Sequence, residues 1–202
     1  MTLDWIDDLD SLHALYGEPG EASLVKVSDR LTPHYRKWIM ASRFCVLTTV
    51  GPEGTDGSPR GDEGPVVTEL DERTLAMPDW RGNDRIDSLR NIVRDGRVSL
   101  MFMVTGSNNV VRVNGNARIT ADPELAERLG RGGKRPRAVI VIRIGEVYFQ
   151  CARAIVRARL WSSGGESPQV PSAGDFLKEG KQDFDGASYD ADWPERAAAT
   201  LW

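Results

Sequence analysis

Four arginines beside turns are the side chains best suited to chemistry in this sequence, because each could bind an anion. They are Arg60 in "SPRGDEG", Arg81 and Arg85 in "AMPDWRGNDRIDSLRNI", and Arg112 in "VVRVNG". Apolar periodicity predicts a helix over residues 81–94, with Asn83 or Asp84 as its N-cap. A helix N-terminus already carries roughly half a positive charge and favours acids. Two further arginines at that end therefore need a reason.

The residues alone leave two interpretations of these arginines open. Neighbouring aspartates could pair with them, although exposed ion pairs contribute only about 0–1 kcal/mol each. Alternatively, the helix start and the arginine forks could bind an anion, where each charge-assisted bond contributes roughly 1.5–3 kcal/mol. We give these interpretations equal weight.

Other site chemistries find little support. The sequence has two histidines, His13 and His34, and no CxxC motif, so we expect no metal site. It lacks the G-x-S-x-G elbow of nucleophilic serines, a Walker loop and the dinucleotide motif G-x-G-x-x-G. The basic stretch "RGGKRP" is interpreted as a solvated connection.

Composition describes an ordinary globular protein. The chain has 202 residues, 40% of them hydrophobic and 28% charged, with a net charge of -4. That charge argues against a broad nucleic-acid surface, and no apolar run approaches the roughly 20 residues of a membrane span. The acidic start lacks signal-peptide features. Cys45 and Cys151 lie beside apolar residues, so we expect two buried free thiols and a cytoplasmic location.

The hydrophobic pattern indicates a mainly β fold with peripheral helices. We expect a helix over residues 2–16 and one from Thr32 onward with Pro33 in its first turn. Strands are expected at Phe44–Gly51, "GPVVTEL", "RTLAMPD", Arg97–Val104, Val110–Thr120 and Ala138–Cys151, the last bent at Gly145, with a short helix at "DPELAERL". About six closely spaced strands indicate an antiparallel barrel with helices at its ends and one helix after the third strand.

Three regions follow from this pattern. Residues 1–31 form an N-terminal helical extension, residues 32–161 form the barrel, and residues 162–202 form a polar C-terminal extension. The C-terminal extension keeps large aromatic side chains, namely Phe176, Phe184, Tyr189, Trp193 and Trp202. Because such side chains are costly to leave in water, we expect this extension to pack on the barrel or on a dimer partner.

The order of the motifs resembles a known family. A strand ending in "SPRGD" precedes "PDWRGNDRIDSLRNI", "VSLMFMV", "VVRVNGNARIT" and "VYFQCARAIVRARLW". This succession resembles the pyridoxamine 5'-phosphate oxidase-like superfamily of FMN-binding split barrels over roughly residues 30–161. Within that superfamily it looks most like a bacterial branch of flavin oxidoreductases. The resemblance implies a six-stranded split barrel that forms a homodimer, with FMN in a cleft between the subunits.

The resemblance assigns particular residues to FMN. Those along the flavin ring and ribityl chain would be Arg60, Gly61, Asp62 and Trp80. Those at the phosphate would be Arg81, Asn83, Arg85 and Ser88, and those contributed by the other subunit would be Arg112 and Trp161. No residue is assigned a catalytic role, and the extra charge at the helix start would serve a phosphate.

Departures from the family limit the expected activity. The vitamin-making oxidases end with an arginine-bearing segment that binds the substrate phosphate, whereas this sequence ends "ERAAATLW". Gln150 and Arg153 replace the histidine and lysine of many relatives. We expect an FMN-dependent oxidoreductase acting on a small molecule other than pyridoxamine 5'-phosphate. A deazaflavin-dependent reductase and a non-enzymatic flavin-binding or storage module remain alternatives. A haem-handling protein ranks last because both histidines lie in predicted N-terminal helices, outside the strands of the barrel.

Overall fold

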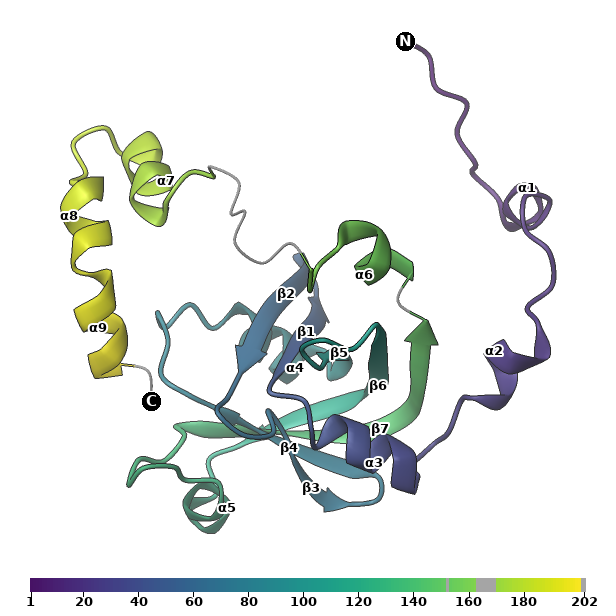
Figure 1. Cartoon of the computed structure of the whole chain (residues 1–202), viewed down its shortest axis with the longest axis horizontal. Helices are drawn as coiled ribbons and strands as arrows, with labels where there is room; N and C mark the ends of the chain where they lie inside the picture. Colours follow the sequence, from purple (N-terminus) through teal and green to yellow (C-terminus); the bar gives the residue numbers. More distant parts are fainter. Residues whose placement is uncertain (152, 163–169, 201–202) are drawn as a thin grey trace.

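The computed structural model describes residues 1–151, 153–162 and 170–200, and these form one seven-stranded antiparallel sheet with peripheral helices (Figure 1). The strands are β1 (Phe44–Gly51), β2 (Gly54–Gly61), β3 (Thr68–Asp71), β4 (Thr74–Asp79), β5 (Arg97–Met103), β6 (Asn109–Thr120) and β7 (Ala138–Cys151). The helices are α1 (Leu9–His13), α2 (Glu21–Val25), α3 (Pro33–Ile39), α4 (Asp87–Arg94), α5 (Pro123–Arg128), α6 (Arg153–Ala158), α7 (Ala173–Gly180), α8 (Gly186–Ala191) and α9 (Trp193–Thr200).

The sheet is a barrel that does not close. Its strand order is β2-β1-β5-β6-β7-β4-β3, so β2 and β3 are edges that do not pair with each other. The prediction of a mainly β split barrel is therefore confirmed, with seven strands where about six were expected. The additional strand is β2, which only Pro52 and Glu53 separate from β1 and which the hydrophobic pattern did not include among the expected strands. For the same reason α4 follows the fourth strand and not the third.

Alternating side chains build the core between the sheet and two helices. In β1, Cys45 and Leu47 are fully buried, while the neighbouring Val46 is half-buried on the opposite face. The largest fully buried side chains are Phe102, Ile39, Leu47, Leu75, Met77, Leu100, Ile140 and Ile142. Helix α3 contributes Ile39 to this core, and α4 contributes Ile92.

Two glycines permit close approach at points that shape the barrel. Gly145 is an extra residue in β7, because Asn114 pairs with Glu146 whereas Gly115 pairs with Ile144. This bulge lies where the sequence predicted a bend. At Gly51, a Cβ would collide with the amide oxygen of Asn91 in α4. The missing side chain therefore lets α4 lie close to the end of β1.

The helix expected over residues 81–94 is six residues shorter at its start. Helix α4 begins at Asp87, and its N-cap is Ile86, which makes no side-chain capping bond. The two predicted N-caps instead form a turn before the helix. Asn83 accepts a hydrogen bond from the Arg85 backbone at 3.0 Å, and Asp84 has φ +60°. Gly, Asn and Asp favour turns, so local turn chemistry overrides the helical periodicity over residues 81–86.

The N-terminal extension differs from its prediction. The helix expected over residues 2–16 is reduced to α1, and a further short helix, α2, follows it. Every residue from 1 to 25 is exposed, so the apolar stripe has no surface to pack against. Helices this short are marginal in water without tertiary packing.

The C-terminal extension has its own internal packing. Helices α7 and α8 approach closely at Gly174 and Gly186, where a Cβ on either residue would collide with the backbone of the other. Gly174 also donates its backbone N–H to Asp190 at 2.9 Å. Phe176 and Trp193 remain 61% and 57% exposed. Trp202, which was also expected to pack, lies outside the described residues.

Two further expectations have mixed outcomes. Cys45 is buried as predicted, but Cys151 is exposed because it is the final residue of β7, beyond the core. Across the described ranges, no helix has the length and apolar character that crossing a membrane requires.

Candidate functional site

A cleft of about 690 Å³ lies between β2 and the end of β4, where the barrel is split. Its walls come from β2, the end of β4, the loop of residues 80–86, the start of α4 and residues 137–138. Pockets of about 300–1,000 Å³ are typical of sites for cofactors and small molecules. Polar contacts between β2 and the opposite wall cross the cleft at three places.

The first crossing is centred on Asp62, whose side chain is only 1% exposed. Its carboxylate accepts hydrogen bonds from the indole Nε1 of Trp80 at 3.1 Å, from Arg131 Nε and from the backbone of Gly64 at 3.2 Å. Arg131 also forms an ion pair with Asp62 at 3.0 Å. A buried charge needs such partners, and here they join three separate segments at one end of the cleft.

The second crossing is the ion pair between Arg60 on β2 and Asp79 on β4, at 2.6 Å. Both side chains are largely buried, at 19% and 17% exposure, but the Nε of Arg60 is buried with no hydrogen-bond partner. Arg60 also lies opposite Cys45 in the β1–β2 ladder. Burial raises the pKa of the Cys45 thiol to about 12, and the nearby Arg60 charge only partly opposes this rise. Cys45 is therefore an inert core thiol.

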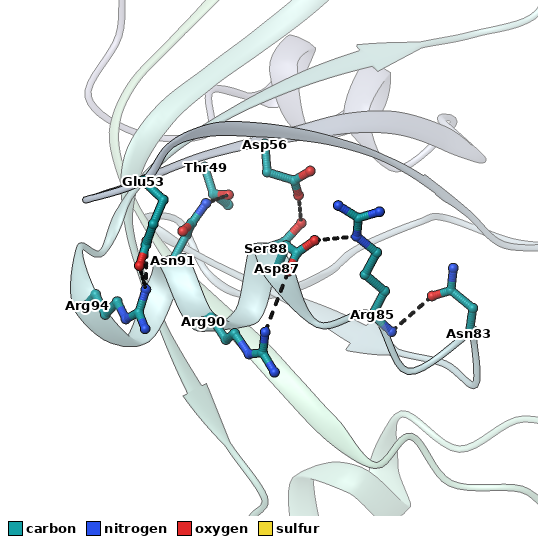
Figure 2. Close-up of polar contacts among 10 residues, drawn as sticks. All are labelled: Thr49, Glu53, Asp56, Asn83, Arg85, Asp87, Ser88, Arg90, Asn91 and Arg94. Atoms are coloured by element: carbon teal, nitrogen blue, oxygen red, sulfur yellow. Dashed lines mark hydrogen bonds and ion pairs between the residues drawn. The ribbon is translucent and has the colours of Figure 1, made fainter. Parts of the chain in front are cut away.

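The third crossing joins Ser88, in the first turn of α4, to Asp56 on β2 (Figure 2). The Ser88 hydroxyl donates to the Asp56 carboxylate, and Ser88 is buried. One turn further on, Asn91 donates to the Thr49 hydroxyl at 3.1 Å. These bonds fix the start of α4 against β1 and β2.

Arg85 lies just before this helix, and its side chain is 80% exposed. Its Nε is 2.6 Å from the Asp87 carboxylate, which raises the pKa of the Arg85 guanidinium (Figure 2). The local ion pair foreseen as one interpretation of the arginines is therefore present. An anion at this end of the cleft would have to compete with Asp87 for Arg85.

Two further arginines line the cleft, one in the 80–86 loop and one just before β7. Arg81 lines the cleft and has no hydrogen bond or ion pair with another residue that the structure describes. Arg137 lines it too and pairs with Asp84 at 2.6 Å, with both side chains more than 60% exposed. Arg81, Arg85 and Arg137 thus all line the cleft, and the last two are largely exposed and held by ion pairs.

A second hollow of about 460 Å³ lies on the other side of the α4 start. It is lined by the charged residues Glu53, Asp56, Arg85, Asp87, Arg90 and Arg94. Arg94 pairs with Glu53 at 2.7 Å, and Arg90 lies 3.8 Å from Asp87. Equal numbers of acids and bases leave this hollow without a net attraction for anions.

The cleft collects most of the residues assigned from the resemblance. Those that line it are Arg60, Gly61, Asp62, Trp80, Arg81, Asn83, Arg85 and Ser88. Arg112 instead lies on the sheet face opposite to Val111 and Val113, with its guanidinium 5.4 Å from the Tyr148 ring centre. Trp161 donates to the Ser107 carbonyl at 2.7 Å and packs beside Val110, away from the cleft.

Sequence reasoning missed Arg131 and Arg137 as cleft residues. Arg131 belongs to "RGGKRP", which was interpreted as a solvated connection, and Arg137 directly follows it. Each binds an aspartate more than 50 positions away. The only local signal was a density of four cations in seven residues. Asp79 was likewise not selected, because nothing in its local sequence shows that it faces Arg60.

Comparisons with known proteins agree with this architecture. The Group A Streptococcus protein HupZ shares 20% identity, with a TM-score of 0.50 over 60% of this chain and 95% of that chain. A single-substitution variant of HupZ gives 18% identity and the same TM-score over 59% and 98%. At these identities the likeness shows a shared fold. No curated protein sequence matches the chain. The sequence model of the pyridoxamine 5'-phosphate oxidase family matches residues 31–151, more than half of the chain, and the protein therefore belongs to that family.

Proposed function

We propose that the cleft binds FMN, with the phosphate at the 80–86 loop and the flavin ring along β2. The observation that carries this proposal is that Arg81 and Arg85, both in the loop just before α4, line the same 690 Å³ cleft. A phosphate is doubly charged near neutral pH and suits both arginine forks and free backbone N–H groups. Family membership supports the choice of FMN.

The ring end of the cleft also offers suitable groups. Strand β2 pairs only with β1 among the described strands, so alternate backbone groups point to its open edge, although the Asp62 N–H donates to the Arg43 carbonyl at 3.0 Å. Arg60 also lines the cleft, and its buried Nε is a donor without a hydrogen-bond partner. An unpaired buried donor is costly, and a heteroatom of a bound ring would satisfy it. Trp80, held by Asp62, supplies an aromatic wall.

We propose that the phosphate lies among Arg81, Asn83, Arg85 and Ser88, but these residues are not equally available to contact it. The Ser88 hydroxyl already donates to Asp56, so its contribution to a phosphate would require that bond to break. Arg81 could contact a phosphate without breaking a described bond, and Arg85 would have to give up only its ion pair with Asp87. We therefore assign the main phosphate contacts to Arg81 and Arg85.

We further propose that the functional unit is a homodimer. Arg112 and Trp161 lie away from this chain's own cleft, on a face that also carries the half-buried Met101 and Met103. Covering this face with a second subunit would bury it and bring Arg112 and Trp161 to the partner's cleft. Sedimentation should show a dimer, and a stable monomer with full flavin content would contradict this assignment.

FMN would supply electron-transfer chemistry, and the protein would bind, orient and shield it. Asp62 is engaged by three donors, whereas Glu63 lines the cleft without a described partner, and we assign neither carboxylate as a general base. We propose an oxidoreductase that acts on a small molecule in the cytoplasm. Pyridoxamine 5'-phosphate is not the expected substrate. The arginine of α9, Arg196, stacks on Tyr189 and Trp193 and is not free to bind a substrate phosphate.

The visible spectrum of the purified protein tests this function. Absorption typical of oxidised flavin, recovered after FMN is removed and added back, supports the proposal. Absorption further to the blue would favour a deazaflavin, for which Arg137 at the same cleft end is a specific argument. A Soret band would indicate haem. If FMN binds but is neither reduced by nicotinamide cofactors nor reoxidised at useful rates, the protein is a flavin-binding module and not an enzyme.

The C-terminal extension is proposed to dock on the barrel or across the dimer. Its exposed Phe176 and Trp193 are the side chains that such docking would bury. Removing residues 163–202 should then lower thermal stability or flavin content. Unchanged values for both would show that this extension does not contribute to the barrel.

A further inference from the structure

The net charge of -4 conceals a strong separation of charge along the chain. Residues 1–25, here called the arm, contain six carboxylates and neither lysine nor arginine. Residues 26–162 contain 23 basic and 16 acidic side chains. An acidic arm therefore precedes a basic barrel, and opposite charges of this kind favour docking of one on the other.

The arm is also apolar, and its apolar side chains are in water. Trp5, Leu9, Leu15 and Tyr16 are between 66% and 72% exposed. Figure 1 shows the arm, with α1 and α2, leading away from the sheet. Large exposed apolar patches with charged neighbours mark interaction surfaces. The arm thus has the composition of a docking segment, and none of its residues is buried in this structure.

The base of the arm is fixed, so the arm leaves the barrel at a defined place. Ser28 and Val147 exchange two backbone hydrogen bonds, at 3.0 and 2.7 Å. Tyr35 donates its hydroxyl to the Lys26 carbonyl at 2.5 Å and accepts from the Phe149 backbone at 3.2 Å. The ammonium of Lys26 lies over the Tyr148 ring, which also contacts Arg112. The arm therefore starts beside the sheet face proposed above as the dimer contact.

Helix α6 has the complementary surface. Its Ile155 is buried against the barrel, whereas the opposite side exposes Arg153, Val156 and Arg157 at positions i, i+3 and i+4. Leu160, two residues beyond the end of the helix, is exposed as well. Val156 and Leu160 are 57% and 47% exposed. Among the described residues, neither Arg153 nor Arg157 has an ion-pair partner. This stripe is apolar and basic, as the arm is apolar and acidic.

We propose that the arm of one copy of this chain docks on the α6 stripe of a second copy. The apolar side chains of α1 pack on Val156 and Leu160, and aspartates beside them pair with Arg153 and Arg157. In a two-fold dimer the exchange is reciprocal, so both arms and both stripes are covered at once. The inference rests on the dimer part of the proposed function and is independent of FMN binding.

Cross-linking between differently tagged, co-expressed chains tests this contact. All chains carry Cys151→Ser to remove the exposed thiol, one carries Leu9→Cys, and the other carries Val156→Cys. A short bis-maleimide should give a two-chain product joining the two tags. The matched control is Val93→Cys, a valine 77% exposed on another arginine-bearing helix, α4. Equal yields of the two-chain product with the Val156→Cys and Val93→Cys partners would overturn the proposal. A chain that carries both Leu9→Cys and Val156→Cys would also overturn it if all its cross-links were within one chain.

Equilibrium sedimentation gives a second, separate readout. Deleting residues 1–25, or combining Arg153→Glu with Arg157→Glu, should weaken dimerisation at least about tenfold, with circular dichroism confirming the fold. Arg90→Glu on α4 is the control and should leave dimerisation unchanged. If the deletion leaves the dimer constant unchanged while the wild type binds FMN, the arm contact is wrong and the proposed function stands. A monomeric wild type would overturn both the arm contact and the homodimer.

Discussion

The two ends of the cleft differ in how firmly their charges are already held. At one end the Asp62 carboxylate is buried and accepts from Trp80, Arg131 and Gly64. Elsewhere in the lining, Arg81 lacks a described partner, Arg85 pairs with the half-buried Asp87, and Arg137 pairs with the exposed Asp84. Buried, fully partnered groups keep a shape, whereas exposed pairs can exchange partners at little cost.

We infer from this difference that one group of residues maintains the shape of the cleft and the other binds the anion. The Asp62 end joins β2, the loop after β4 and the 131–137 loop, so it sets the width of the cleft. The Arg81–Arg85 end keeps positive charge available for an incoming anion. Substitutions at the two ends should therefore affect different properties, and the following changes test that separation.

Asp62→Ala should have the largest effect, and the effect should be on stability. Removing the carboxylate leaves Arg131 and the Trp80 indole without their acceptor, which should lower the free energy of unfolding by about 2–3 kcal/mol. Urea denaturation of the two proteins measures this change. Glu63→Ala, at the exposed neighbouring acid, is the control and should stay within about 0.5 kcal/mol. If both substitutions lowered the free energy of unfolding equally, the Asp62 contacts would have no special role in holding the cleft together.

Arg85→Ala should affect binding and not stability. Loss of a charge-assisted fork should weaken FMN binding about 10- to 150-fold, while riboflavin, which lacks the phosphate, should bind both proteins equally. Lysine should restore only part of the affinity, because it lacks the planar fork. Fluorescence titration of the apo-protein gives these values. Arg94→Ala, which removes a cation paired with Glu53 in the same helix, should leave FMN affinity nearly unchanged.

Asp87→Asn should produce a smaller change in the opposite direction. The Asp87 carboxylate holds Arg85 and places negative charge at the start of α4, where the phosphate is proposed to bind. Neutralising it should tighten FMN binding about 2- to 5-fold. The same titration measures this gain. Weaker binding would mean that Asp87 positions Arg85 for the phosphate and does not compete with it.

Arg137→Ala should have the smallest effect on stability. The Arg137–Asp84 pair is exposed on both sides, so its loss should cost less than about 1 kcal/mol in unfolding free energy. Thermal denaturation of the Arg137→Ala and Asp62→Ala proteins under the same conditions compares their losses of stability. A loss as large as that of Asp62→Ala would show that both ends of the cleft hold its shape.

Local sequence patterns were reliable where one periodicity dominated. The bounds of β1 and β7 agree with their predictions, because β-branched and aromatic residues dominate both strands. The start of α4 was wrong, because turn-forming Gly82, Asn83 and Asp84 lie within an otherwise helical pattern. Competition between two local signals is decided by the tertiary structure, which the sequence pattern does not contain.

The site was predictable only as far as the family motifs extend. Eight of the ten assigned residues line one cleft, and this grouping came from the resemblance and not from spacing. Arg131 and Arg137 were missed because their partners, Asp62 and Asp84, are distant in sequence. The charge separation between arm and barrel was readable from the sequence, but the total of -4 obscured it.

A crystal structure of the protein grown with FMN tests the central claim most directly. The account predicts the phosphate within hydrogen-bonding distance of Arg81 and Arg85, the ring beside residues 60–62, and Asp62 still bonded to Trp80 and Arg131. FMN bound elsewhere, or reversed with its phosphate at the Asp62 end, would contradict the account.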